Sequence, residues 1–307
     1  MSDQPTTPIL AIVGVTASGK SSLALAIARN DPRVELVSVD SMQVYRGMDI
    51  GTAKPTAAEQ AEVRHHMIDV ADPWDDYTVS EFQAGAAAAI ADIERRGGVP
   101  VLVGGTGLHL RSVVDELDIP GQFPDVAAAF EEEATEALFE RLVELDPDAS
   151  GRMEPTNRRR IVRALEVTVG SGRRFSSYGP GLDAYPPTRF RMIGPRWERP
   201  AVDARIERRY DEQMHQGFLA EVGRLAADER GLSRTASQAL GYRQLLEHIH
   251  GEASLEDALE RAIIATRQFA RRQERWFRRD PRITWIDVAE NPMEALPAVM
   301  GEYEACS

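Results

Sequence analysis

Short apolar runs alternate with helical patterns through the first third of the chain. The apolar runs are rich in Val, Ile and Leu and lack polar alternation, which is typical of strands buried on both faces of a parallel sheet. We predict such strands, in chain order, at 9–13, 34–39, 66–70 and 99–103. Helices are expected between them, at 22–29, 57–63 and 79–96. Strands joined by crossover helices predict an α/β fold with helices flanking a parallel sheet.

This alternation stops at Asp118. A Pro/Gly linker follows at 119–124, and the later patterns predict helices at 126–145 and 157–169. We interpret 119–189 as a helical insertion domain between two parts of one core domain, 1–118 and 190–307. The second part is predicted to contain strands and helices, in chain order, at 190–194, 201–228, 237–250, 255–279 and 283–286.

One glycine-rich turn joins the first strand to the first helix. Gly14, Val15, Thr16, Ala17, Ser18, Gly19, Lys20 and Ser21 fit the P-loop pattern G-x-x-x-x-G-K-[ST]. In such a loop, backbone N–H groups and a helix N-terminus point at phosphate oxygens. Lys20 would add a positive charge and Ser21 a hydroxyl ligand for Mg²⁺. The fold is therefore predicted to be P-loop NTPase-like and to bind a diphosphate or a triphosphate, and the loop does not distinguish these ligands.

Two other strand ends carry polar or glycine-rich turns. Asp40 and Ser41 follow the second strand, and 104–106 follows the strand at 99–103. Ligands of parallel sheets bind outside the carboxyl ends of the strands, so these turns should meet the P-loop at one crevice. Asp40 could be a general base, a ligand of Mg²⁺ through water, or a helix cap. Thr106 could approach a ligand closely or simply form a turn.

Composition and charge limit the class of protein. Hydrophobic residues make up 43% of the 307 residues and charged residues 28%, as in ordinary globular proteins. The start is polar and no apolar run approaches the roughly 18 residues of a membrane span, so we expect a cytoplasmic protein with no membrane partner. Cys306 is the single cysteine, which excludes an internal disulfide. We expect a monomer.

Arginines concentrate in two places although the net charge is −13. Arg267, Arg271, Arg275 and Arg279 form a stripe along one predicted helix, with Arg272 and Arg278 beside it. A second cluster consists of 158–160 with Arg163. Each cluster alone is compatible with a solvated helix face, whereas two clusters in an acidic chain favour contact with RNA or DNA. The arginines 205, 208 and 209 alternate with acidic residues, which predicts pairing within their helix.

Several longer motifs make the chain similar to one known family. The run from Asp40 to Pro55 reads DSMQVYRGMDIGTAKP, and the other motifs are the P-loop, LVGGT at 102–106, NRRRIVRALE at 157–166, GYR at 241–243 and TRQFARRQ at 266–273. These motifs, from about residue 9 to 287, resemble the bacterial tRNA dimethylallyltransferases of the IPP transferase family. Val15 departs from the family pattern, which usually has proline there.

The resemblance implies a particular reaction. The P-loop would bind dimethylallyl diphosphate, and N6 of adenosine 37 in a tRNA would attack the prenyl C1 and release diphosphate. Asp40 matches the family's catalytic base, Thr106 a residue near the amine and the leaving group, and Arg205 a diphosphate ligand. Mg²⁺ would be held with Ser21.

The resemblance also implies a surface for the tRNA anticodon stem-loop. Its members would be Asp40, Ser41, Met42, Gln43, Arg158, Arg159, Arg160, Ile161, Val162, Gln238, Ala239, Leu240, Gly241, Tyr242, Arg243, Arg271, Arg272, Gln273, Arg275 and Arg278. Two alternatives remain from the residues themselves, a P-loop kinase of small molecules and an RNA-binding NTPase switch. A related class of enzymes prenylates free AMP, but the basic C-terminal helix and the insertion favour tRNA.

Overall fold

The computed structural model describes residues 7–306, which form two compact units. Within the described residues, the core unit consists of 7–114 and 187–306, and the insertion unit is Asp115–Pro186. The boundaries that we predicted from the sequence lie a few residues further along the chain. No helix within 7–306 is long and apolar enough to cross a membrane.

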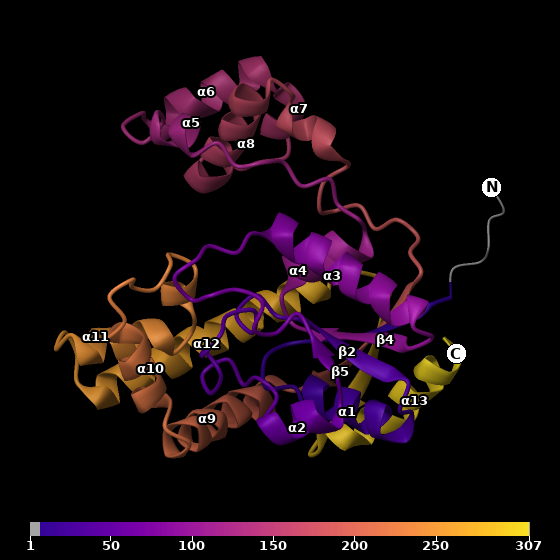
Figure 1. Ribbon diagram of the computed structural model, residues 1–307. Coiled ribbons are helices and arrows are strands. Elements are labelled where there is room, and N and C mark those ends of the chain that lie inside the picture. The colour runs from indigo at the N-terminus through magenta and orange to yellow at the C-terminus, as the bar shows by residue number, and fades with distance from the viewer. Residues whose placement is uncertain (1–6, 307) are drawn as a thin grey trace. The chain divides into compact units, whose positions relative to one another are not determined.

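The core unit is built on one six-stranded parallel sheet (Figure 1). Its strands, in chain order, are β1 (Ile9–Val13), β2 (Val34–Val39), β3 (His65–His66), β4 (Val99–Gly104), β5 (Phe190–Trp197) and β6 (Ile283–Val288). The order across the sheet is β3-β2-β4-β1-β5-β6, and every pair is parallel. The predicted α/β class with a parallel sheet is confirmed.

The predicted strand at 66–70 is wrong. Only His65 and His66 pair with β2, because Met67 and Asp69 adopt φ angles of 61° and 55°. Such left-handed residues cannot continue an extended strand. The Asp69 carboxylate accepts a hydrogen bond of 2.6 Å from Lys54 Nζ, which holds the turn in place.

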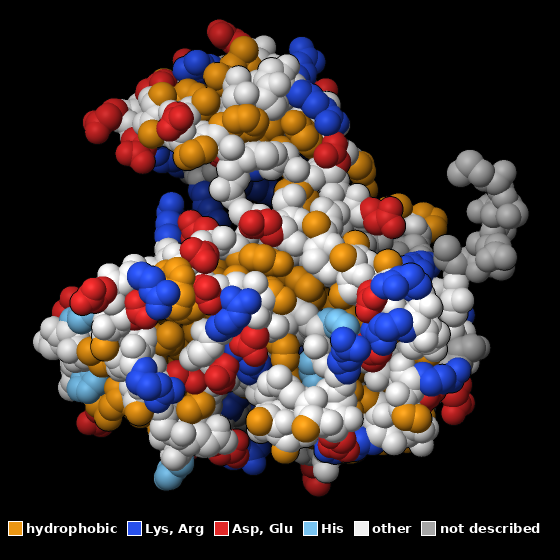
Figure 2. Space-filling view, in the orientation of Figure 1, with side chains coloured by type: hydrophobic (Ala, Val, Ile, Leu, Met, Phe, Trp, Pro, Cys, Tyr) orange, Lys and Arg blue, Asp and Glu red, His pale blue; other side chains and the backbone are white. Residues whose placement is uncertain are grey.

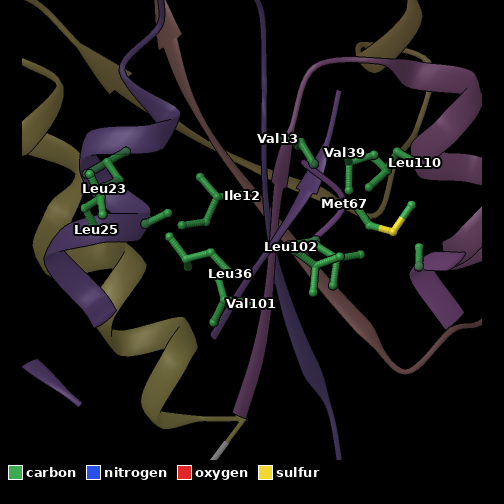
Figure 3. Close-up of a cluster of buried hydrophobic side chains, with 14 of the residues drawn as sticks. Ile12, Val13, Leu23, Leu25, Leu36, Val39, Met67, Val101, Leu102 and Leu110 are labelled. Carbon is green, nitrogen blue, oxygen red and sulfur yellow. The ribbon is translucent and has the colours of Figure 1, made fainter. Parts of the chain in front are cut away.

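The strands bury side chains on both faces of the sheet, which explains their unbroken apolar runs. Figure 3 shows Ile12 and Val101 on the face with Leu23 and Leu25, and Val13 and Leu102 on the face with Leu110. Leu23 and Leu25 belong to α1 (Lys20–Asn30), and Leu110 belongs to α4 (Gly107–Val114). Successive strand residues therefore supply two separate apolar layers, as a period of two requires.

Helices cover the sheet and extend beyond its carboxyl edge (Figure 1). The other helices of the core unit are α2 (Ala57–Glu62), α3 (Val79–Arg95), α9 (Arg199–His215), α10 (Phe218–Ala226), α11 (Tyr242–Ile249), α12 (Leu255–Phe277) and α13 (Leu296–Glu304), with short 3-10 turns η2 (Ala236–Gln238) and η3 (Pro292–Ala295). The single helix predicted at 201–228 is wrong, because Gly217 adopts a φ of 98° and separates α9 from α10.

The insertion unit is helical and has its own small core. It contains α5 (Pro124–Ala128), α6 (Thr135–Leu145), α7 (Pro147–Ser150), α8 (Arg158–Ser171) and the 3-10 turn η1 (Phe175–Tyr178). Leu138, Leu142, Ile161 and Leu165 are completely buried there. The single helix predicted at 126–145 is wrong, because α5 ends at Ala128 and α6 begins only at Thr135.

Arg158 stabilises the segment between α5 and α6. Its guanidinium donates to the carbonyl oxygens of Phe130, Glu131 and Glu133 at 2.7, 2.8 and 2.6 Å, and to Thr135 Oγ1 at 3.3 Å. The planar guanidinium suits this task because it presents several donors in a fixed geometry. Arg158 is therefore a structural residue of the insertion unit.

We predict that Arg158→Ala loosens this segment whereas Arg159→Ala does not. Removing donors from several carbonyls should cost about 2 kcal/mol of local stability. Hydrogen exchange of peptides covering 124–145 should then be roughly thirtyfold less protected. Arg159 is exposed and serves as the matched control. Equal protection in the two variants would contradict this role of Arg158.

Candidate functional site

The P-loop adopts a cradle conformation between β1 and α1. Gly14, Ala17 and Gly19 have φ angles of 147°, 61° and 88°, and the first helical residue is Lys20. A Cβ atom on Gly19 would lie 2.2 Å from Pro292 Cβ, so only glycine fits at this helix start. The turn therefore presents backbone N–H groups at the N-terminus of α1, as an anion site requires.

Lys20 carries a desolvated charge at this cradle. Its Nζ donates to the carbonyl oxygen of Val15 at 2.7 Å. Burial lowers the pKa of Lys20 from its usual 10.5 to about 8, the Asp40 carboxylate opposes this shift, and Arg209 adds to it. A positive charge kept in a poorly solvated place gains strongly from a bound anion.

Two arginines of α9 complete the positive side of the site. Arg205 Nε donates to the carbonyl oxygen of Ala17 at 2.6 Å, and its guanidinium lies 4.5 Å from the ring centre of Trp197. Arg209 Nη1 donates to Thr16 Oγ1 at 2.8 Å. Burial lowers the pKa of both guanidinium groups. The predicted pairing of these two arginines within their helix is wrong, because both side chains turn toward the P-loop.

Asp40 and Thr106 lie at neighbouring strand ends and are connected through Ser41. Asp40 Oδ1 accepts from the backbone N–H groups of Met42 at 2.8 Å and Gln43 at 3.4 Å. Thr106 Oγ1 accepts from the backbone N–H of Ser41 at 3.2 Å. Within residues 7–306, no hydrogen bond to Asp40 Oδ2 is formed, so this oxygen remains available as an acceptor.

Gln273 of α12 joins the P-loop to the turn before Thr106. Its Oε1 accepts from the backbone N–H of Thr16, and its Nε2 donates to the carbonyl oxygen of Gly105, both at 2.8 Å. Gln273 is buried, so its side chain is a link between the two turns rather than part of an exposed tRNA surface. Its position three residues after the buried Ala270 and four before the buried Phe277 was the signal for this orientation.

The arginine stripe of α12 divides into paired and exposed members. Arg267 is half-buried and its Nη2 lies 2.5 Å from Oε1 of the exposed Glu207, so it forms an ion pair with α9. Four arginines that we predicted to contact tRNA are exposed, namely Arg271, Arg272, Arg275 and Arg278. Arg278 also pairs with Glu274 at 2.5 Å.

Burial removes three further side chains from the predicted tRNA surface. Ile161 is completely buried in the insertion unit, and Ala239 and Tyr242 are buried in the core unit. Gly241 is also buried, with a φ of 85° that favours glycine at the start of α11. The exposed members outside α12 are Arg159, Arg160, Gln238 and Arg243, whereas Ser41, Met42, Gln43, Val162 and Leu240 are half-buried.

A cavity of about 190 Å³, partly open to solvent, lies beside the P-loop. Its apolar walls are Val15, Pro195, Trp197, Val202, Ala270 and Trp285, and arginines of β5, α9 and α12 stand at its edge. Such a lining suits a ligand with an apolar part and an anionic part. Val15, the P-loop residue that departs from the resembling family, is part of this wall.

The described residues contain no ready-made metal cage. In 7–306, no three His, Cys, Asp or Glu side chains are grouped so as to hold an ion. The candidate ligand Ser21 is exposed in the first turn of α1. A single hydroxyl fits Mg²⁺, which usually keeps several waters and is bound mainly through substrate phosphates.

We predict that Lys20→Met stabilises the protein at pH 7. The folded-state pKa of about 8 lies below the usual 10.5, so the unfolded chain binds the proton more tightly and the cost to stability is complete below pH 8. The difference corresponds to about 3 kcal/mol, which the lost hydrogen bond to Val15 offsets by roughly 1. Urea unfolding should show a gain of about 2 kcal/mol at pH 7 that disappears near pH 10. A gain that does not change with pH would contradict the desolvation of Lys20.

Comparison with known proteins places the chain in one family. The family model for IPP transferase matches residues 43–280, and the model for isopentenyl transferase matches residues 7–73. A tRNA dimethylallyltransferase of Nocardioides sp. is 47% identical over 284 residues, with 91% of each chain covered. The tRNA dimethylallyltransferase of Kineococcus radiotolerans is 45% identical, with 96% of this chain and 98% of the relative covered.

Solved structures agree with this assignment. The tRNA isopentenylpyrophosphate transferase of Bacillus halodurans superposes with a TM-score of 0.71 at 34% identity, and 98% of each chain is covered. A eukaryotic dimethylallyltransferase acting on tRNA has a TM-score of 0.80 over 97% of this chain and 79% of its own, and its 24% identity supports the fold alone. The chain therefore belongs to the IPP transferase family of tRNA dimethylallyltransferases.

Proposed function

We propose that this protein transfers the dimethylallyl group of dimethylallyl diphosphate to N6 of adenosine 37 in the anticodon loop of tRNAs. The observation that carries the proposal is the junction at Gln273, which holds a phosphate cradle directly against the turn that contains Thr106. The diphosphate of the donor would then bind next to the turn that would hold the acceptor amine. The relatives named above support the choice of donor and acceptor.

The positive side of the site suits a diphosphate leaving group. Lys20, Arg205 and Arg209 all contact P-loop atoms, and burial lowers the pKa of each of them. Preorganised charges in a poorly solvated site stabilise charge that develops in a transition state far better than water does. Their role is to stabilise the negative charge that grows on the diphosphate as the bond from prenyl C1 to oxygen breaks.

Asp40 would accept the proton of the attacking amine. In the reaction, N6 forms a bond to prenyl C1, the C1–oxygen bond breaks, and one N6 proton is transferred to a base. Asp40 Oδ1 is fixed by two backbone N–H groups, which leaves Oδ2 as the acceptor. Adenine N6 is a weak nucleophile because its lone pair is delocalised, so a positioned base should contribute roughly 10²–10⁴-fold. Thr106, linked to Ser41, lies at the same strand ends and would orient the amine.

Mg²⁺ would bind to the site together with the substrate. Ser21 would provide the protein's oxygen ligand, and the remaining ligands would be diphosphate oxygens and water. When bound, the ion would supply further positive charge beside the leaving group.

The tRNA surface would use exposed arginines from both units. These are Arg271, Arg272 and Arg275 of α12, Arg278 directly after it, Arg243 of α11, and Arg159 and Arg160 of α8. On the visible face of the core unit, acidic and basic side chains are interspersed (Figure 2). Binding should therefore depend on particular arginines rather than on one large basic field. The target base must leave its stack to reach Asp40, as in other enzymes that act on a base.

The reaction is tested by the fate of labelled dimethylallyl diphosphate. We expect label in tRNA, at an adenosine of the anticodon loop, and stoichiometric release of diphosphate. ATP and AMP serve as alternative substrates in parallel reactions, because a kinase would consume ATP and an AMP prenyltransferase would label AMP. Label in AMP, or consumption of ATP with unlabelled tRNA, would overturn the proposal.

We predict that Arg272→Gln with Arg275→Gln weakens tRNA binding and reduces its salt dependence. Each lost phosphate contact lowers the slope of log K against log salt concentration by roughly 0.7–0.9, so the double variant should lose about 1.4–1.8. Arg29→Gln with Arg33→Gln changes the charge equally on another surface and serves as the control. The same slope in both double variants would remove α12 from the interface.

A further inference from the structure

A buried carboxylate holds the middle of the loop that follows Asp40. Glu221 of α10 is only 1% exposed. Its Oε2 accepts from the backbone N–H groups of Asp49 and Ile50 at 3.1 and 2.9 Å, and its Oε1 accepts from that of Gly51 at 3.3 Å. Tyr242 Oη donates to the same Oε1 at 2.5 Å. Burying a charged carboxylate is costly unless donors surround it, and here four donors do so.

The loop segment around Gly51 also packs closely against the helices. A Cβ atom on Gly51 would lie 2.2 Å from Phe218 Cε2 and 2.4 Å from Tyr242 Cε2. These two rings contact each other edge to face, with centres 4.9 Å apart. Gln213 of α9 donates to the carbonyl oxygens of Ile50 and Gly51 at 2.6 and 3.2 Å. Three helices therefore fix the backbone of 49–51, and Glu221 is the charged centre of this contact.

Gln43 continues the connection from this loop to Asp40. Its Nε2 donates to the carbonyl oxygens of Thr52 and Ala53 at 3.2 and 3.1 Å, directly after the segment that Glu221 holds. Its Oε1 accepts from Ser38 Oγ at 2.7 Å. The backbone N–H of Gln43 is in turn one of the two donors to Asp40 Oδ1. Hydrogen bonds, joined through the backbone of 51–53 and the side chain of Gln43, thus connect Glu221 to Asp40.

We propose that Glu221 is a positioning residue for prenyl transfer, which sets the orientation of Asp40 through the 49–53 backbone and Gln43. Tyr242 extends this connection to α11, since it lies beside the exposed Arg243. Neither Glu221 nor Tyr242 contacts the reacting atoms, because both are buried between α10, α11 and the loop. The inference rests on the proposed role of Asp40 as the base.

A double-mutant cycle with Asp40 tests this inference. Glu221→Gln keeps the shape of the side chain but loses one acceptor, and Tyr242→Phe removes only the hydroxyl. Single-turnover rates at saturating labelled dimethylallyl diphosphate and tRNA are measured for each variant alone and combined with Asp40→Ala, and the KM for dimethylallyl diphosphate is measured for each variant with Asp40 intact. Asp40→Ala should itself lose about 10²–10⁴-fold in rate while tRNA affinity stays within twofold of the wild type.

The expected result is strong non-additivity. Glu221→Gln should lower the rate roughly ten- to a hundredfold and Tyr242→Phe about threefold, with the KM for dimethylallyl diphosphate unchanged, because a small displacement of a reacting group is costly to kcat. In the Asp40→Ala background, both substitutions should have no further effect.

Other outcomes show whether the positioning role or the proposed function is wrong. Multiplicative losses in the Asp40→Ala background, or no loss with Asp40 intact, would overturn the positioning role. If Glu221→Gln fails to fold, the Tyr242→Phe cycle decides by the same criterion. A wild-type protein that does not prenylate tRNA would instead contradict the proposed function.

Discussion

Desolvated positive charge beside the P-loop is the interaction on which the rest of the site depends. Lys20, Arg205 and Arg209 come from two helices, and each is held by an oxygen of the P-loop. Asp40 is the carboxylate that opposes the pKa shifts of Lys20 and Arg209, so it lies within their electrostatic reach. A poorly solvated cluster of positive charges of this kind is strongly stabilised by a bound anion, which is the basis for proposing that the cradle holds a diphosphate.

The parallel sheet makes this arrangement possible because it gathers turns from distant parts of the chain. The strand order β2-β4-β1 brings the ends of three strands together. At the end of β4, the lack of a side chain on Gly104 leaves room for the end of β2. A Cβ atom on Gly104 would lie 2.0 Å from the carbonyl oxygen of Val39. Gln273 of α12 bonds to the backbone of Thr16 and Gly105, so the same helix carries this structural link and the exposed arginines. The P-loop and the turn before Thr106 are therefore held by the same helix.

The features that follow local rules could be predicted from the sequence. The P-loop, the strand-end position of Asp40 and the strands β1, β2 and β4 depend on short patterns of apolar and glycine residues. The helix breaks at Gly217 and at 129–134 were missed, because apolar periodicity continues across both while the backbone turns. Arg209 was missed since acidic neighbours on its helix suggested local pairing. Glu221 could not be found either, because its partners are backbone N–H groups 170 or more residues away in sequence.

In the proposed reaction, the P-loop of this protein holds a leaving group, so that the bond from carbon to oxygen breaks. Dimethylallyl diphosphate labelled with ¹⁸O at the oxygen between C1 and phosphorus tests this most directly. Attack by the tRNA amine on C1 predicts that all of the ¹⁸O appears in the released diphosphate, which mass spectrometry detects. Recovery of the ¹⁸O in dimethylallyl alcohol or dimethylallyl phosphate would mean that a phosphorus–oxygen bond is cleaved, as in a phosphoryl-transfer enzyme, and would contradict this account.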